Sequence, residues 1–365
     1  MSKIVSIATA VPSFRHQQKD ILSFMQKVYA LNETENRKLR FLYRQSAIET
    51  RYSVLSDYSL KADEWQFYPA SENLEPFPDL ETRMKWYYQN AAPLSLKAIK
   101  DCISQKVNKD EITHLITVSC TGMSAPGLDL QIVEMMDLPK NIFRTSINFM
   151  GCYAAIHGMK LADAFCKNDK NAKVLVVCTE LCTLHFQKNT SADSIAAGLL
   201  FGDGSAAMLI VNDDDKLEGL KLKSFYSEVG FNGKEHMSWQ LSSSGFLMTL
   251  SGYVPELIER DFNDLFHSAL QNAGMTEDDI SHYCIHPGGK RILSSIEKTT
   301  SITPADLRHS YRILKDYGNM SSPTILFVLK EILDSIGNKK ETKTNIFGAA
   351  FGPGLTMETF ILSDD

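Results

Sequence analysis

Residues 173–180, with the sequence Lys-Val-Leu-Val-Val-Cys-Thr-Glu, form a near-continuous apolar run rich in valine. A strand that is apolar on both faces needs cover on both faces, so this run argues against a sheet with one face in water. Elsewhere, apolar runs such as 3–11 and 282–286 alternate with amphipathic segments such as 255–273 and 323–336. This alternation predicts an α/β fold with buried, largely mixed sheets.

The chain length and one polar run indicate two units within that fold. A chain of 365 residues suits two core-forming units or one large duplicated unit. After the run Asn212-Asp-Asp-Asp-Lys216 the strand–helix pattern begins again. We therefore predict an N-terminal half at residues 1–212 and a C-terminal half at residues 217–365. Residues 54–80 are polar and interrupted by prolines, so we expect them to run over the surface.

Charge, hydropathy and cysteine spacing exclude several classes of protein. The net charge of −6 argues against a broad nucleic-acid-binding face. No segment has 18 consecutive apolar residues, so we expect no membrane span. The seven cysteines are scattered and form no CxxC pair, which argues against a metal site. Reduced thiols in a cytoplasmic protein are the expected state.

Cys152 occupies a setting that suits a nucleophile. A short β-rich run at 146–149 is followed by Met150-Gly-Cys-Tyr-Ala154 and then by helical spacing of Ala, Leu and Met at 153–165. This junction predicts that the thiol lies in the first turn of a helix. Free N–H groups and the helix dipole favour a thiolate there. The alternative is a small buried cysteine packed beneath the start of the helix.

Two further polar residues could complete a nucleophilic site. His286 ends an expected strand and is followed by Pro287-Gly-Gly289, a turn that would expose its imidazole. Asn319 directly precedes the expected helix at 323–336. A cysteine nucleophile needs a base and donors for developing negative charge, and histidine and asparagine supply both. Taken alone, each residue is equally well explained as a structural residue whose polar atoms are hydrogen-bonded, or as a helix cap.

Five motifs in a fixed order give the chain a family resemblance. They are Met150-Gly-Cys-Tyr-Ala, Phe201-Gly-Asp-Gly, His286-Pro-Gly-Gly, Tyr317-Gly-Asn-Met-Ser-Ser and Phe351-Gly-Pro-Gly, and Ile48-Glu-Thr-Arg-Tyr52 adds to them. Together they resemble the type III polyketide synthases, the chalcone synthase family, and in the residues before Phe351 the bacterial members. The resemblance implies a thiolase-like αβαβα fold of five layers with two structurally similar halves, a homodimer and a Cys–His–Asn site.

The resemblance also implies roles for individual residues. Cys152 would hold the acyl group, while His286 and Asn319 would bind thioester carbonyls. The expected substrate-binding residues are Phe201 as a gate and, around it, Thr121, Cys182, His185, Met248, Ser321, Phe351, Gly352, Pro353 and Gly354. Cys182, His185 and Met248 stand where plant members carry other residues, so the starter and the product do not transfer from chalcone synthesis.

A basic stripe near the N-terminus is the expected binding site for the phosphates of coenzyme A. Lys38, Arg40 and Arg44 lie where the family binds coenzyme A phosphates. A solvated helix surface would explain the same pattern, and the sequence does not decide which of the basic residues binds.

The implied activity is that of an acyltransferase. It would condense malonyl-CoA repeatedly, with loss of carbon dioxide, onto an acyl-CoA starter held on Cys152. Cyclisation would follow, to a pyrone, a resorcinol or a phloroglucinol ring. We expect coenzyme A thioesters as substrates, no metal or redox cofactor, and a thiol pKa lowered by His286. The sequence leaves open the starter, the number of extensions and the mode of cyclisation.

Three other functions, two enzymatic and one non-catalytic, remain open at this point. An initiating ketoacyl–carrier-protein synthase of fatty-acid synthesis would share the Cys–His–Asn set. A hydroxymethylglutaryl-CoA synthase would use a catalytic glutamate, for which Glu180 is the candidate. A non-catalytic relative would bind acyl-CoA without reacting.

Overall fold

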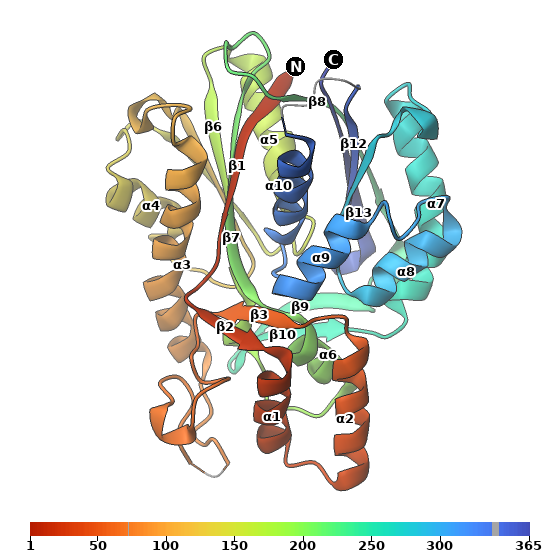
Figure 1. The fold of residues 1–365 in the computed structure, drawn as a ribbon. Helices are drawn as coiled ribbons and strands as arrows, with labels where there is room; N and C mark the ends of the chain where they lie inside the picture. Colours follow the sequence, from red (N-terminus) through yellow and green to blue (C-terminus); the bar gives the residue numbers. More distant parts are fainter. Residues whose placement is uncertain (72, 338–342) are drawn as a thin grey trace.

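The computed structural model describes residues 1–71, 73–337 and 343–365 and is built around a mixed sheet (Figure 1). Within the described residues this sheet has nine strands. In spatial order they are β11 (His282–Ile285), β12 (Asn345–Gly352), β13 (Thr356–Ser363), β8 (Leu220–Val229), β1 (Ser2–Ala10), β7 (Asp203–Asn212), β6 (Lys173–Leu181), β4 (His114–Ser119) and β5 (Phe143–Asn148). The polar run 213–216 lies in the loop between β7 and β8.

The two sides of this sheet repeat one pairing scheme. β1 and β8, which pair through Lys3 and Ile4, meet in the middle. Moving outward from β1, the partners β7, β6 and β4 pair antiparallel, antiparallel and parallel. Moving outward from β8, the partners β13, β12 and β11 pair in the same senses. The chain therefore has two structurally similar halves, as predicted for a thiolase-like fold.

Helices complete five layers across the molecule (Figure 1). α3 (Leu80–Ile103) and α4 (Leu128–Met136) cover the outer face of the N-terminal strands. α5 (Ala154–Asn168) and α10 (Thr324–Ile336) lie between the two sets of strands. α7 (Val254–Asn272) and α8 (Lys290–Thr299) cover the outer face of the C-terminal strands, and α9 (Arg308–Tyr317) lies beside α10.

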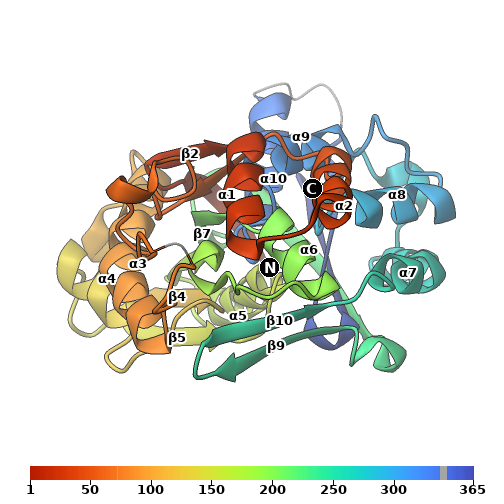
Figure 2. The ribbon, with the colours of Figure 1, turned by 90° about the horizontal axis from the view of Figure 1, so that it is seen from below.

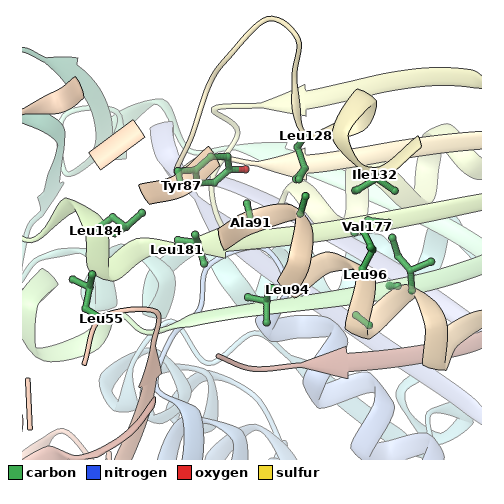
Figure 3. Close-up of a cluster of buried hydrophobic side chains, with 14 of the residues drawn as sticks. Leu55, Tyr87, Ala91, Leu94, Leu96, Leu128, Ile132, Val177, Leu181 and Leu184 are labelled. Carbon is green, nitrogen blue, oxygen red and sulfur yellow. The ribbon is translucent and has the colours of Figure 1, made fainter. Parts of the chain in front are cut away.

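β6 confirms the argument made from its apolar sequence. Leu175 and Val177 are fully buried in the outer core with residues of α3, as the close-up of Tyr87, Ala91, Leu94 and Val177 illustrates (Figure 3). Val174 and Val176 point the other way and are fully buried in the central core against α5 and α10. Each face of the strand is dry because a helical layer covers it.

The segment at 54–80 was predicted to run over the surface, and this prediction is wrong. Tyr58, Tyr68 and Leu74 are buried. Tyr58 and Tyr68 pack against Phe24 with ring centroids 5.0 and 5.3 Å apart, in the core that also holds Phe186. The average polarity of the segment concealed aromatic residues at the few positions that face inward.

A smaller group of elements lies at one end of the layers (Figure 2). It comprises a two-stranded sheet of β2 (Phe14–Gln17) with β3 (Thr50–Ser53) and a hairpin of β9 (Met237–Ser242) with β10 (Gly245–Leu250). The helices there are α1 (Gln18–Tyr29), α2 (Glu33–Gln45) and α6 (Ala192–Leu200). The chain also has the short 3-10 helices η1 (Ala62–Glu64), η2 (Lys109–Glu111), η3 (Cys182–His185), η4 (Phe231–Gly233), η5 (Glu277–Asp279) and η6 (Pro353–Leu355).

Among the described helices, none combines the length and the apolar character needed to cross a membrane.

Candidate active site

The structure brings Cys152, His286 and Asn319 together around one cavity of about 330 Å³. Each of the three lies next to the end of a strand or helix: Cys152 follows the edge strand β5, His286 follows the opposite edge strand β11, and Asn319 precedes α10. Ligand sites of α/β proteins commonly lie beyond the carboxyl ends of strands. The Sγ atom of Cys152 is 3.9 Å from both the Oδ1 and the Nδ2 atoms of Asn319.

Glycines allow the chain to pass closely on both sides of Cys152. Gly151 has φ +81°, its N–H donates to Cys120 Sγ over 3.0 Å, and a Cβ there would collide with the ring of Pro353. A Cβ on Gly352 would be 2.6 Å from Tyr153 Cδ1. Cys152 itself lies two residues before the first residue of α5, so it is not in the first helical turn as predicted.

Asn319 is held so that its amide N–H groups remain available. Its Oδ1 accepts from the Ser321 N–H over 2.7 Å, which fixes the amide plane and leaves Nδ2 as the donor beside Cys152. Its backbone N–H donates to Leu200 O over 3.0 Å, and its backbone O accepts from the Gly202 N–H over 2.9 Å. These two bonds form an isolated parallel bridge with Phe201. The N-terminal half therefore sets the position of a residue of the C-terminal half.

His286 is a buried and neutral imidazole. Its backbone N–H donates to Ala349 O over 2.8 Å at the end of β11. Neither ring nitrogen has a hydrogen-bond partner within the described part of the chain. Burial lowers the pKa of His286 to about 3, since a charged ring would lose its hydration without a compensating partner.

The thiol of Cys152 is also neutral. Burial raises its pKa to about 11, and the side-chain hydrogen bonds of Ser321 and Asn319 oppose this increase only in part. The charge of Glu180 adds to the increase. The predicted lowering of the thiol pKa by the helix start and His286 is therefore wrong for this state. Desolvation raises the thiol pKa by more than the dipole of α5, which begins two residues later, can lower it. His286 is neutral, so no imidazolium stabilises the thiolate.

Glu180 is a buried link between two loops of the site. Its Oε2 accepts from the Cys120 N–H and the Thr121 Oγ1–H over 2.8 Å each, and its Oε1 accepts from Ser322 Oγ–H over 2.8 Å. Burial raises its pKa to about 7. Glu180 is not among the lining residues of the cavity, which gives no support to the reading of Glu180 as a catalytic glutamate.

Most of the predicted substrate-binding residues line the cavity. These are Phe201, Thr121, Cys182, His185, Met248, Ser321, Phe351 and Pro353. Gly352 lies behind the wall against Tyr153, and Gly354, with φ +75°, is not among the lining residues. His185 is a structural part of the wall. Its Nε2 bonds Thr121 O over 2.7 Å, its Nδ1 accepts from the Phe246 N–H over 3.1 Å, and its ring stacks on Phe246 at 4.3 Å.

The predicted coenzyme A residues do not line the cavity, although their helix does. Leu42 and Gln45 of α2 are lining residues. Lys38 shares their helical face at spacings of four and seven residues, whereas Arg40 and Arg44 lie about 200° around the helix from Leu42. Lys290 and Arg291, at the start of α8, line the cavity and were missed. A basic pair directly after His286-Pro-Gly-Gly was the available signal.

Arg51 is a further residue whose role the sequence did not reveal. It is buried at 4% exposure, and its Nε donates to Gln18 Oε1 over 2.9 Å. Its Nη1 donates to Phe201 O over 2.5 Å, and its stem lies against Gly318, where a Cβ would be 2.9 Å from Arg51 Cγ. Arg51 thus supports both strands of the bridge between Phe201 and Asn319.

No group of three or more His, Cys, Asp or Glu side chains is placed to hold a metal ion in the described ranges.

Comparisons with known proteins cover the whole chain. Residues 1–214 match the family model "Chalcone and stilbene synthases, N-terminal domain", and residues 222–364 match the corresponding C-terminal domain. The chain is 28% identical over 360 residues to "Alpha-pyrone synthesis polyketide synthase-like Pks18" of Mycobacterium tuberculosis, covering 97% of this chain and 89% of that protein. It is 29% identical over 372 residues to "Probable polyketide synthase 1" of Dictyostelium discoideum, but spans 11% of that protein's length.

Two solved structures are similar throughout. The crystal structure of PKS-I from the brown alga Ectocarpus siliculosus aligns with a TM-score of 0.91 at 25% identity, over 99% of this chain and 98% of that chain. The C-terminal type III polyketide synthase domain of Steely1, a type I/III hybrid from Dictyostelium, aligns with a TM-score of 0.89 at 27% identity, over 99% of each chain.

We expect Arg51→Met to lower kcat/KM by about tenfold or more and to cost about 1–3 kcal/mol of stability, because Phe201 O and Gln18 lose their buried donor. Arg51→Lys should recover little, since an ammonium group cannot donate to both acceptors in the same geometry. Arg15→Met, on the exposed face of the neighbouring strand, is the control. Thermal melts and steady-state kinetics measure both effects, and a stable Arg51→Met enzyme with normal kinetics would contradict this role.

The neutral thiol predicts how Cys152 reacts with iodoacetamide. With a pKa of about 11, its alkylation rate should rise roughly tenfold per pH unit from pH 7 to pH 10. Glu180→Gln removes a nearby negative charge above pH 7, so it should lower the thiol pKa and speed alkylation there. Glu134→Gln, on the surface, should change nothing. Peptide mapping of Cys152 follows the reaction, and a rate that levels off below pH 8 would mean a preformed thiolate.

Proposed function

Because this chain belongs to the chalcone and stilbene synthase family and is a type III polyketide synthase, an acyltransferase, we propose that it extends an acyl-CoA starter on Cys152 with malonyl-CoA. The observation that carries the proposal is the placement of Asn319. Its amide oxygen accepts from the Ser321 N–H, and its Nδ2 lies 3.9 Å from the thiol that would hold the chain.

The first proposed step is acyl transfer to Cys152. The neutral imidazole of His286 accepts the thiol proton as the sulfur attacks the starter thioester. The bond from the carbonyl carbon to the coenzyme A sulfur breaks, and the departing thiolate takes the proton from His286. A general base that is neutral before substrate arrives suits this exchange, because an imidazolium could not accept a proton.

The second proposed step is decarboxylation of malonyl-CoA. Carbon dioxide leaves, and the electron pair of the broken bond resides on the thioester oxygen as an enolate. An N–H of His286 and the Asn319 amide donate to that oxygen. The enolate carbon then attacks the acyl-Cys152 carbonyl, the carbon–sulfur bond breaks, and Cys152 leaves as a thiolate. The Cys152 thiolate then attacks the thioester carbonyl of the extended chain, coenzyme A leaves as a thiolate, and the chain is again held on Cys152 for another cycle.

Coenzyme A thioesters are the proposed substrates, and these steps use no metal or redox cofactor. Lys38, Lys290 and Arg291 are the proposed ligands of the coenzyme A phosphates, while a role for Arg40 and Arg44 stays a prediction. Cyclisation of the finished chain would release a pyrone, a resorcinol or a phloroglucinol. The name of the Mycobacterium tuberculosis relative makes an α-pyrone the first product to look for.

A homodimer is the proposed assembly, and the edge strand β5 is the proposed contact. β5 has one sheet neighbour, β4, so its other edge is unpaired within the described residues. Phe143 on β5 is 70% exposed, and Leu130 and Met135 of the adjacent α4 are exposed as well. An unpaired edge beside exposed apolar side chains favours association with a second copy.

The two functions of the site can be separated by substitution. Cys152→Ala should release carbon dioxide from malonyl-CoA and accumulate acetyl-CoA, but make no polyketide. Asn319→Ala should still accept a starter acyl group, while decarboxylation falls by about 10²-fold or more, the usual cost of one oxyanion donor. His286→Ala should impair both steps. Labelled malonyl-CoA with carbon dioxide trapping, together with intact-mass analysis of the acyl-enzyme, measures each step.

The outcomes also separate the competing activities. Normal decarboxylation by Asn319→Ala would remove its oxyanion role. An acyl adduct on Cys178 or Cys182 in place of Cys152 would overturn the nucleophile assignment. Activity that requires a carrier protein, with one condensation, would favour a ketoacyl–carrier-protein synthase, and complete inactivity with labelled substrate bound would favour a non-catalytic relative.

Phe143→Glu should convert the dimer to a monomer of 41.0 kDa, because it places a charge in the proposed contact. Phe231→Glu makes the same change at a side chain that is 82% exposed on η4 and should leave the dimer intact. Sedimentation velocity reports the mass of each. A wild-type monomer, or a Phe143→Glu dimer, would contradict the assignment of β5.

A further inference from the structure

We propose that Arg83, which lies outside the cavity, is a positioning residue that fixes one cavity wall and thereby sets how tightly an acyl-CoA starter binds. The wall is formed by η3 and the β9–β10 hairpin, and we define it by the lining residues Cys182, His185, Trp239 and Met248. Arg83 belongs to α3 and is not among the lining residues, so it acts on a substrate only through the wall. The part that concerns the starter rests on the proposed function.

Arg83 is a fully buried guanidinium. Its exposure is 0%, its Nε donates to Pro78 O over 3.1 Å, and its Nη1 donates to Leu184 O. Its remaining nitrogen, Nη2, has no hydrogen-bond partner, and no Asp or Glu pairs with the guanidinium, within the described ranges. Replacement of a buried charge by an apolar side chain of similar size is often neutral for stability. What Arg83 supplies that an apolar side chain cannot is a set of fixed donors.

Aromatic rings and the surrounding core fix the direction of these donors. The Cζ atom of Arg83 lies 6.0 Å from the ring centroid of Phe67 and 5.4 Å from that of Phe77, within the range of cation–π contacts. Leu184, whose carbonyl accepts from Nη1, lies in the same buried cluster as Tyr87, one helical turn beyond Arg83 (Figure 3). The guanidinium therefore supports η3 from the side of α3.

Arg83 also supports the β9–β10 hairpin. Gly245, the first residue of β10, has φ +127°, and a Cβ there would be 2.9 Å from both Cδ and Nε of Arg83. The Leu80 N–H at the start of α3 donates to Ser243 O, in the turn of the hairpin, over 3.1 Å. The same stretch of α3 thus determines the position of both parts of the wall.

Hydrogen bonds join the two parts of the wall to each other. Gln187 Nε2 donates to His185 O over 3.1 Å and to Ser244 O over 3.2 Å. The His185 ring accepts from the Phe246 N–H and stacks on the Phe246 ring. Because of these bonds, η3 and the hairpin are expected to move together when their support is lost.

The wall contacts the loop that carries the nucleophile. The ring centroid of Phe246 lies 5.0 Å from that of Phe149, three residues before the nucleophile. Trp239 Nε1 donates to Cys120 O, and Cys120 Sγ accepts from the N–H of Gly151. A displaced wall would therefore change the space beside the nucleophile in which a starter acyl group binds.

The two proposed enolate donors have other supports. The His286 backbone N–H donates to Ala349 O, and Asn319 is bridged to the turn between α6 and β7. Neither contact involves η3 or the hairpin. Loss of Arg83 is therefore expected to weaken starter binding while decarboxylation of malonyl-CoA continues.

The kinetic test uses Arg83→Met, which keeps most of the side-chain volume and removes the donors. Loading of Cys152 from acetyl-CoA and hexanoyl-CoA is followed by intact mass at increasing thioester concentration. The concentration for half-maximal loading should rise by about tenfold or more, while carbon dioxide release from malonyl-CoA stays within about twofold of wild type. Lys85→Met, at an exposed position of α3, should match wild type in both assays. A wild-type loading curve, or an equal loss of decarboxylation, in folded Arg83→Met would overturn the proposal.

Hydrogen exchange examines the wall without relying on activity. In Arg83→Met, amide exchange in residues 182–187 and 237–250 should become faster by about tenfold or more, whereas exchange in β7 should not change. Wild-type exchange in both wall segments would overturn the placement. If the wild-type enzyme loads neither thioester, the proposed function loses its support, and the exchange result still decides whether Arg83 holds the wall.

Gly245→Ala disturbs the same contact from the other side. Its Cβ would press on Arg83, so the same rise in half-maximal concentration and the same local increase in exchange are expected. Gly274→Ala is the matched control, because Gly274 also has a positive φ of +65° but a Cβ there meets nothing within 4 Å, and it should behave as wild type. If Arg83→Met does not fold, Gly245→Ala decides: wild-type loading and exchange in the folded variant would overturn the proposal.

Discussion

Two backbone hydrogen bonds hold the site together, from Asn319 N–H to Leu200 O and from Gly202 N–H to Asn319 O. They join the loop before α10 to the turn between α6 and β7, and so connect the two halves of the chain beside the cavity. Arg51 stabilises this bridge by donating a hydrogen bond to Phe201 O. The position of Phe201, the placement of the Asn319 side chain and the loop before α10 all depend on these few contacts.

Desolvation dominates the electrostatics of the cavity. Burial keeps both Cys152 and His286 uncharged, and the buried carboxyl of Glu180 is shared between two loops rather than directed at substrate. The charged lining residues Arg51, Lys290 and Arg291 are basic, and Cys152 and His286 add no charge of their own. Under the proposed mechanism, N–H donors that are already oriented would stabilise the enolate oxygen without having to reorganise.

Sequence patterns predicted the features that are local. The valine-rich run of β6, the helix after Cys152 and the Cys–His–Asn set all follow from neighbouring residues or ordered motifs. The features that failed depend on distant contacts. Aromatic residues in 54–80 are buried because α1 and Phe186 cover them, and the thiol pKa is set by the depth of the cavity.

The basic stripe on α2 also shows that sequence proximity does not determine which side chains face the cavity. Lys38, Arg40 and Arg44 are close in sequence, but α2 turns Lys38 toward the cavity side and the two arginines to the other side. In the sequence, Arg51 is only one residue of a family motif. Its hydrogen bonds to Phe201, 150 positions later, and to Gln18, 33 positions earlier, are seen only in the folded chain.

The division of the site between the halves has a consequence for biosynthesis on the ribosome. Cys152 is made well before His286 and Asn319, and Asn319 reaches its place only when it bridges to Leu200 and Gly202. A chain that has emerged as far as β7 carries the Cys152 thiol without His286 or Asn319. Until the C-terminal half docks on the N-terminal half, the Asn319 side chain is not held beside Cys152. Under the proposed mechanism, the complete site therefore forms only when both halves are folded and in contact.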